Sequence, residues 1–342
     1  MTKKENKKTT NFNENDIRPD NLMDMEKIYM LKDIGRLLQR REEFVEVDCP
    51  ACGSSSHIKS FIKYGFDYNQ CDKCETLYVS PRPNESLLDW FYTDSYLYKY
   101  WNDHIFPSTE EARREKIFIP RVDRTLEICN NFIDSPSSLL EIGAAYGTFC
   151  AEIQKRHYFK RIVAIEPTPW LAKICRNRGI DVIEKMIENV EFSKDNKFDV
   201  VVNFEVIEHL YSPKDFINNC YRLLNKNGLL IITCPNGKGF DFSVLGDKCE
   251  SIDHEHLNYF NPNSIKILLE ENGFRLLNIM TPGKLDAELV RKKVISGEIL
   301  LSKQKFLETI LIDRWDDLNV AFQNFLAENM LSSHMWCVAQ KN

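Results

Sequence analysis

A strand followed by a glycine turn lies near the middle of this chain. Residues 138–142 are a short apolar run, and Gly143 and Gly147 follow it before a helical pattern that begins near Thr148. Glycine lets the backbone turn tightly and approach a ligand closely, because it has no Cβ atom. The free N–H groups of the first helical turn would then point at that ligand. The sequence therefore predicts a ligand-binding strand, turn and helix at 138–149.

An acidic residue supports this prediction. Glu166 ends a second apolar run, 161–166, nineteen residues after Gly147. A carboxylate at such a position accepts both hydroxyls of a ribose in nucleotide-binding folds. Ala145 stands where the middle glycine of the dinucleotide fingerprint would be, so the turn alone also fits an ordinary strand-to-helix connection.

Two later segments resemble motifs of the class I S-adenosylmethionine (SAM) methyltransferases. Residues 198–210 resemble the fourth motif of that family, and residues 223–233 resemble the helix, turn and strand that come next. Together with 138–149 they stand in the order and spacing of the family. The resemblance covers roughly residues 120–283 and a final strand. It implies an α/β fold with a seven-stranded, Rossmann-like class I methyltransferase sheet, whose last strand inserts antiparallel beside the sixth.

The hydrophobic pattern agrees with alternating strands and helices from residue 138 onward. Strands are predicted at 138–142, 161–165, 180–183, 198–203, 228–233, 274–280 and 334–340. The segment between the last two is helical in pattern. We therefore predict a methyltransferase domain at 133–342, with a helical insertion at 285–330 that partly covers the active site.

The resemblance also implies the cofactor contacts. The turn would flank the methionine and ribose of SAM, supported by Glu141, and Glu166 would hold the ribose hydroxyls. Met186 and Ile187 lie where the adenine-contacting loop of the family sits, although the family commonly has Asp at the position of Met186. Phe204 and Glu205 would lie along the methionine. The implied cofactor-binding residues are Glu141, Gly143, Ala145, Gly147, Glu166, Met186, Ile187, Phe204 and Glu205.

Two Cys-x-x-Cys pairs stand in the N-terminal part of the chain. Cys49 and Cys52 are followed, after 18 residues, by Cys71 and Cys74. Each pair can place two thiolates on one ion, and two pairs complete a tetrahedral Zn²⁺ site. Because all four ligands are cysteines, no position is left for water, and we expect a structural Zn²⁺ in a zinc-ribbon module at 46–82. Four unliganded thiols are the alternative.

The other N-terminal segments are assigned from composition and periodicity. Residues 1–16 are polar and rich in Lys and Asn, which predicts a disordered tail. Residues 17–45 contain a helix, because apolar residues recur at steps of three or four from Leu22 to Leu38. Residues 83–132 are predicted to be an aromatic-rich helical connector or lid.

A Glu-x-x-Glu-His pattern follows the fourth predicted strand. Glu205, Glu208 and His209 would share one side of a helical turn, at i, i+3 and i+4. Some methyltransferases with this pattern bind a divalent metal there, and others keep it without a metal. A packed, hydrogen-bonded structural role is the third interpretation.

A second acidic and histidine-rich cluster, 253–256, lies beyond the fifth strand, where an acceptor would bind. In the zinc-ribbon sugar C-methyltransferases a Glu-His pair at a similar place serves in proton removal, and Glu255-His256 could match it. His254 is the rival base. Alternatively, the pair caps the helix that begins near Asn263. The candidate catalytic residues are His256, Glu255, His254, His209 and Glu208.

Composition limits the environment and the partners. The 342 residues carry a formal net charge of −6, which gives no global attraction to nucleic acid. No apolar run is long enough to span a bilayer, and no signal peptide is evident, so we expect a cytoplasmic protein. The 11 cysteines fit a reducing compartment.

The combination resembles a bacterial group of sugar methyltransferases with an N-terminal four-cysteine zinc module. It predicts an enzyme of carbohydrate biosynthesis that transfers a methyl group from SAM to a sugar, nucleotide-linked or in a polysaccharide precursor, or to a related small metabolite. The large second C-terminal domain of that group is missing, so C-, O- and N-methylation stay open. A zinc-ribbon rRNA or tRNA methyltransferase and a non-catalytic SAM-fold binding module are the alternatives.

Overall fold

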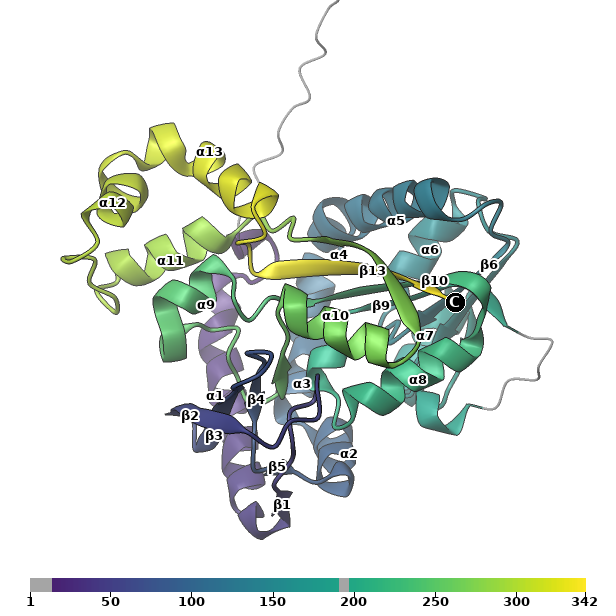
Figure 1. Ribbon diagram of the computed structural model, residues 1–342, viewed down its shortest axis with the longest axis horizontal. Helices are drawn as coiled ribbons and strands as arrows, with labels where there is room; N and C mark the ends of the chain where they lie inside the picture. Colours follow the sequence, from purple (N-terminus) through teal and green to yellow (C-terminus); the bar gives the residue numbers. More distant parts are fainter. Residues whose placement is uncertain (1–13, 191–196) are drawn as a thin grey trace, which may run out of the picture.

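A mixed seven-stranded sheet forms the centre of the computed structural model, which describes residues 14–190 and 197–342 (Figure 1). The strand order is β12-β13-β10-β9-β6-β7-β8. Neighbours from β8 to β10 are parallel, whereas β13 runs antiparallel between β10 and β12. The predicted sheet and its inserted last strand are confirmed. The strands are β6 Ser138–Ile142, β7 Arg161–Ile165, β8 Asp181–Ile183, β9 Phe198–Phe204, β10 Leu224–Pro235, β12 Phe274–Met280 and β13 His334–Lys341.

Helices cover both faces of this sheet, because successive strand residues point to opposite sides. Val200 and Val202 pack with the helices of one face, α5 (Ile119–Phe132) and α6 (Thr148–Gln154). Val201 packs with the helices of the other, α8 (Pro213–Leu223) and α10 (Pro262–Glu271). The helix α7 (Pro169–Asn177) connects β7 to β8. Strands buried on both faces explain the nearly continuous apolar runs in the sequence.

The strand β10 is longer than predicted. It begins at Leu224 rather than at residue 228, and its register against β9 shifts between Leu224 and Leu229. Asn227 has a positive φ of 62° within this irregular stretch. Asn tolerates that conformation, and the polar sequence around it carries no strand periodicity. The prediction therefore placed a turn where the chain already pairs with the sheet.

The glycine turn has a left-handed backbone at three positions. Gly143, Ala145 and Gly147 have φ values of 78°, 47° and 68°. A Cβ atom on Gly143 would lie 2.7 Å from Cγ2 of Val206, so the turn rests on the segment that follows β9. Glycine is thus required at this position by the backbone conformation and by packing within the protein. Close approach of this turn to a ligand stays a prediction.

The N-terminal module is a small sheet of order β11-β4-β3-β2. The predicted ribbon, 46–82, supplies β2 (His57–Lys63), β3 (Phe66–Cys71) and β4 (Leu77–Val79). The fourth strand, β11 (Asn258–Tyr259), comes from the methyltransferase part and pairs antiparallel with β4. Two short strands, β1 (Phe44–Val45) and β5 (Arg82–Pro83), pair beside it. The module therefore shares its sheet with the segment 258–259.

A long helix and a connector flank the module. The helix α1 spans Asp20–Leu38 and is followed by η2 (Arg41–Glu43). Residues 1–13 of the predicted tail lie outside the described residues. The rest of that tail, Glu14–Asp16, forms the short helix η1. The carboxylate of the buried Glu14 lies 2.6 Å from Nζ of Lys292. The connector consists of α2 (Glu85–Asp94), α3 (Tyr96–Tyr100), η3 (Trp101–Ile105), α4 (Phe106–Arg113) and η4 (Arg114–Phe118) before α5.

The predicted insertion 285–330 is helical and projects beyond one end of β13, next to α9 (Phe240–Leu245; Figure 1). It contains α11 (Asp286–Ile295), α12 (Lys305–Glu308), η8 (Thr309–Asp313) and α13 (Trp315–Glu328). The carboxylate of Asp286 accepts hydrogen bonds from Ser332 and Ser333 and so fixes the start of β13. Within the described chain, no helix has both the length and the apolar character needed to cross a bilayer.

The packing of Gly143 against Val206 can be tested with two alanine substitutions. Gly143→Ala and Gly179→Ala both place alanine at a φ near +78°, but a Cβ at Gly179 meets no atom within 4 Å. The left-handed backbone costs each variant about 1 kcal/mol. Crowding by Val206 should cost Gly143→Ala about 1–3 kcal/mol more. Urea denaturation of both variants measures the difference in the free energy of unfolding. Equal losses of stability would show that Val206 moves aside at no cost.

Candidate functional site

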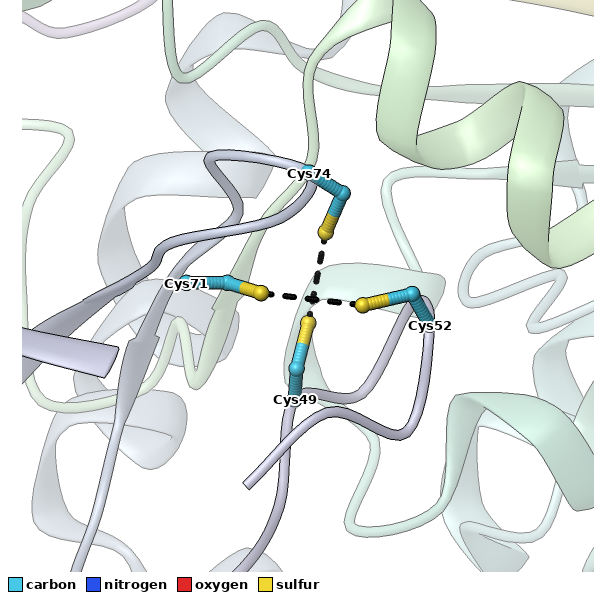
Figure 2. Close-up of side chains that lie close together, drawn as sticks. All are labelled: Cys49, Cys52, Cys71 and Cys74. Carbon is cyan, nitrogen blue, oxygen red and sulfur yellow. Dashed lines mark hydrogen bonds between the residues drawn. The ribbon is translucent and has the colours of Figure 1, made fainter. Parts of the chain in front are cut away.

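The four cysteines of the two Cys-x-x-Cys pairs converge on one point (Figure 2). The Sγ atoms of Cys49 and Cys74 are 3.4 Å apart, those of Cys52 and Cys71 are 3.6 Å apart, and all four lie within 4.8 Å of one another. A tetrahedral ion with Zn–S bonds of about 2.3 Å would separate its sulfurs by about 3.8 Å. The donor set and its spacing fit Zn²⁺, with no open position for catalysis.

Glu166 lies at the carboxyl end of β7 beside the glycine turn. Its Oε2 accepts the N–H of Ala145 at 2.8 Å, and its Oε1 accepts the N–H of Thr168 at 2.9 Å. Burial raises the pKa of this carboxyl group. Each carboxylate oxygen can accept a second hydrogen bond. The arrangement therefore fits the predicted contact with two ribose hydroxyls.

The other predicted cofactor residues lie in different environments. Glu141 is buried, accepts the Cys150 thiol at 3.0 Å, and has its pKa raised to about 8 by burial. Phe204 packs on Phe149, with ring centroids 4.7 Å apart. Met186 is 40% exposed, whereas Ile187, the first residue of η5 (Ile187–Asn189), packs in the core. Their contact with SAM stays a prediction.

Glu205 does not share a helical turn with Glu208 and His209, as its spacing had suggested. Its φ is 56°, and the short helix η6 begins only at Ile207 and ends at His209. The left-handed backbone turns the Glu205 carboxylate away toward the next strand, where Oε1 accepts the Thr233 hydroxyl at 2.5 Å. Such strained positions are often found at functional sites.

Glu208 and His209 instead meet His256, from the second sequence cluster. Each residue places one ligand atom within 4.8 Å of the others, and the two imidazole centroids are 4.5 Å apart. Glu208 is completely buried, and neither of its carboxylate oxygens has a hydrogen-bond partner. The Nδ1 atom of His209 is also buried without a partner. A cluster of unsatisfied buried acceptors is costly for the fold and calls for a proton, a ligand or a metal.

Asp253 orients His256 from the opposite side. The Nδ1 atom of His256 lies 3.0 Å from the carbonyl of Ser251 and 3.2 Å from Oδ2 of Asp253. Burial opposes the charged ring, but Asp253 outweighs it and raises the pKa of His256. Because Nδ1 is engaged, Nε2 is the ring atom free to accept a proton or bind a metal.

His254 and Glu255, the other predicted bases, do not belong to the group of converging ligand atoms at Glu208, His209 and His256. His254 is buried edge-on against Phe91, at 5.4 Å between centroids, and burial lowers its pKa to about 4. Burial raises the pKa of Glu255 to about 8. The alternative that the Glu255-His256 pair caps the next helix is wrong, because α10 is capped by Asn261 through a reciprocal capping box with Ser264.

Two further residues at this edge of the sheet were not singled out from the sequence as site residues. His334, the first residue of β13, has Nδ1 3.5 Å from Oε1 of Glu205, and its Nε2 accepts the Trp336 indole N–H at 3.0 Å. Arg121 of α5 stacks on the Phe204 ring at 4.5 Å. From sequence alone, an arginine on a helix is expected to be exposed to solvent. The residues around a histidine at a strand end form no spaced motif that would indicate a functional site.

Comparison with known proteins places the domain. Residues 110–279 match the family model described as "Methyltransferase domain". A probable SAM-dependent methyltransferase of Mycolicibacterium smegmatis is 35% identical over 82 residues, which are 24% of this chain and 30% of that protein. A ubiquinone biosynthesis O-methyltransferase of Maricaulis maris is 32% identical over 102 residues, 28% of this chain and 39% of that protein. The matched segments thus span well under half of these relatives.

Among solved structures, a SAM-dependent methyltransferase from Archaeoglobus fulgidus is 20% identical, with a TM-score of 0.48, and the match covers 70% of this chain and all of that one. The family match falls on six of the seven strands of the sheet, all except β13, and on the glycine turn and Glu166. This chain carries a methyltransferase domain of the class I, SAM-dependent type.

Proposed function

We propose that this protein is an enzyme that transfers the methyl group of SAM to a hydroxyl oxygen of a small metabolite, with sugars as the first acceptor class to test. The observation that carries the proposal is the position of the Glu208, His209 and His256 cluster. Val206, which immediately precedes η6, packs on Gly143 of the cofactor turn. The turn that carries Glu208 and His209 and the predicted cofactor turn are therefore neighbours.

In an in-line displacement of the methyl group, some residues bind the cofactor and others act on the acceptor hydroxyl. SAM supplies the electrophilic methyl group when it is bound at the glycine turn. Glu166 and the left-handed turn hold its ribose and methionine ends. The neutral form of His256, whose population grows as the pH rises toward the elevated pKa of this ring, takes the hydroxyl proton at Nε2 as the oxygen–carbon bond forms and the carbon–sulfur bond breaks. Burial raises the pKa of Glu208, and the positive charge of His256 opposes that rise, so the imidazolium and an ionised Glu208 favour each other.

Oxygen is preferred to carbon or nitrogen as the acceptor for two reasons. A hydroxyl needs one proton acceptor near the reacting atom, which the Asp253 and His256 pair provides. The Maricaulis relative is named as an O-methyltransferase. The sugar class rests on the resemblance of the four-cysteine module to that of sugar methyltransferases. A structural Zn²⁺ at Cys49, Cys52, Cys71 and Cys74 belongs to this proposal.

A divalent metal at Glu208, His209 and His256 is the second candidate, favoured by the unsatisfied Glu208 oxygens. One carboxylate and two imidazoles suit Mn²⁺, Fe²⁺ or Zn²⁺. Such an ion would bind the acceptor oxygen and lower the pKa of the hydroxyl, which replaces the need for a free base. In that case His256 is a ligand, and Asp253 orients it from outside.

The cofactor contact of Glu166 predicts the behaviour of an isosteric variant. Glu166→Gln should weaken binding of S-adenosylhomocysteine by about 10- to 100-fold, because hydrogen bonds to a charged acceptor are lost. Isothermal titration calorimetry measures this affinity. Glu184→Gln, a surface carboxylate paired with Arg176, is the control and should bind normally. Equal affinities of the two variants would contradict the ribose contact.

The role of His256 predicts a loss of turnover without a loss of cofactor affinity. His256→Asn should lower kcat by about 100-fold or more. The exposed His157→Asn should leave kcat unchanged, and its φ of 51° is one that Asn tolerates. Transfer of labelled methyl from SAM is followed with nucleotide-sugars, catechol and a short structured RNA. Methylation of RNA alone would favour the nucleic-acid alternative, and no transfer with intact cofactor binding would favour a binding module.

The metal alternative predicts a specific stabilisation. Mn²⁺ should raise the melting temperature of the parent protein but not that of Glu208→Gln, because a ligand stabilises only the state that binds it. Differential scanning fluorimetry measures both, with the exposed Glu75→Gln as a control that should respond like the parent. Identical responses of the parent and Glu208→Gln would exclude Mn²⁺ from this cluster.

A further inference from the structure

We infer that the four-cysteine module positions the segment 249–261, which contains His256. Metal bound at the four cysteines therefore controls how well this segment is ordered. The inference rests on the proposed function only where turnover is concerned. It goes beyond a structural role for the metal, because it names the segment that the module holds and the residues through which it does so.

The module and the segment 249–261 share main-chain pairing. The strand β11 pairs antiparallel with β4, so that Asn258 lies opposite Tyr78 and Tyr259 lies opposite Leu77. In addition, the N–H of Val79 donates to the carbonyl of Leu257 at 3.0 Å. A two-residue strand has little stability by itself. The segment therefore depends on the sheet that the module provides.

Side chains of the module reach the first half of the same segment. The hydroxyl of Tyr68, which is fully buried in β3, donates to the carbonyl of Asp253 at 2.7 Å. Lys63 Nζ donates to the carbonyl of Cys249 at 2.7 Å. Asp253 is the residue that orients His256, so Tyr68 acts on the imidazole through one intervening residue. Tyr68 is a positioning residue in this sense.

A cysteine ligand is itself part of the connection. The carbonyl of Cys74 accepts the side-chain N–H of Asn261 at 2.9 Å, and Asn261 caps α10. The knuckle that would hold the metal and the end of the segment 249–261 are thus joined directly. Loss of the ion leaves four thiols, three of them on buried cysteines, within 4.8 Å of one another and removes the constraint on this carbonyl.

Hydrogen bonds also connect the module to the turn that carries Glu208 and His209. Arg82, fully buried at the edge of the module, donates to Oδ1 of Asn258 at 3.0 Å. The amide of Asn258 in turn donates to the carbonyls of Leu210 at 2.8 Å and Glu208 at 3.2 Å. Asn258 therefore ties the Glu208 and His209 turn to the His256 loop. Among the hydrogen bonds of the described residues, none joins the module to the glycine turn or to Glu166.

Hydrogen exchange of the full-length protein tests this inference without an activity assay. The protein is compared as loaded with Zn²⁺ and after removal of the metal by a chelator. Exchange should rise at 46–82 and at 249–261, while 138–150 keeps its protection and the affinity for S-adenosylhomocysteine changes less than about twofold. Faster exchange at 46–82 with unchanged exchange at 249–261 would overturn the inference.

A single hydroxyl gives a second test, which also holds if chelation unfolds the whole chain. Tyr68→Phe removes the hydroxyl that donates to Asp253 and contacts Tyr259, and it should speed exchange at 249–261 about three- to tenfold with normal zinc content. Its matched control is Tyr158→Phe, which loses a hydroxyl bonded to Asn130 in the methyltransferase domain. The histidine ring signals in ¹⁵N NMR should shift for His256 in Tyr68→Phe and not in the control.

The outcomes separate this inference from the proposed function. Unchanged exchange and an unchanged His256 signal in Tyr68→Phe would overturn the positioning role whatever the enzyme methylates. A shifted His256 signal and faster exchange would support it even if every acceptor in the methyl-transfer panel failed.

Discussion

The hydrogen bonds of the buried Arg82 guanidinium hold the two parts of this protein in their arrangement. A charged group in the interior is tolerated only when its donors are satisfied. Arg82 donates to the carbonyls of Val79 and Tyr211 and to Asn258, so it binds the ribbon, the segment after η6 and β11 at once. Its partners are neutral, and burial lowers its pKa to about 10. Removing any partner would leave a donor of this buried charged group unsatisfied between the two parts of the chain.

The sheet and the cofactor half follow from local sequence signals. Apolar strands such as 138–142 and 198–204 are buried on both faces, and the turn between β6 and α6 needs left-handed residues. Periodicity and glycine report such features directly, which is why the strands and the turn were predictable, whereas the place of the last strand in the sheet was implied by the family resemblance. The four-cysteine cluster was predictable for the same reason, since the spacing within each pair determines the geometry of a knuckle.

The residues proposed to act on the acceptor could be predicted only as two separate clusters. Glu208 and His256 are 48 positions apart in the printed sequence, and no local pattern shows that they meet. Glu205 was misplaced because its positive φ takes it out of the helical turn that begins at Ile207, which helical spacing cannot show. Likewise, β11 has two residues and no periodicity, so its place in the ribbon sheet follows from tertiary contacts with β4.

The insertion of β13 between β10 and β12 affects how this chain folds. The edge of β10 that receives β13 has its backbone donors and acceptors open until residues 334–341 arrive, after the helical segment 285–330 has been synthesised. Pairing over so long a separation is slow. The nascent chain therefore passes through a stage in which an apolar strand edge is exposed, and such edges invite pairing with other chains. Chaperone demand during synthesis would concentrate on this interval.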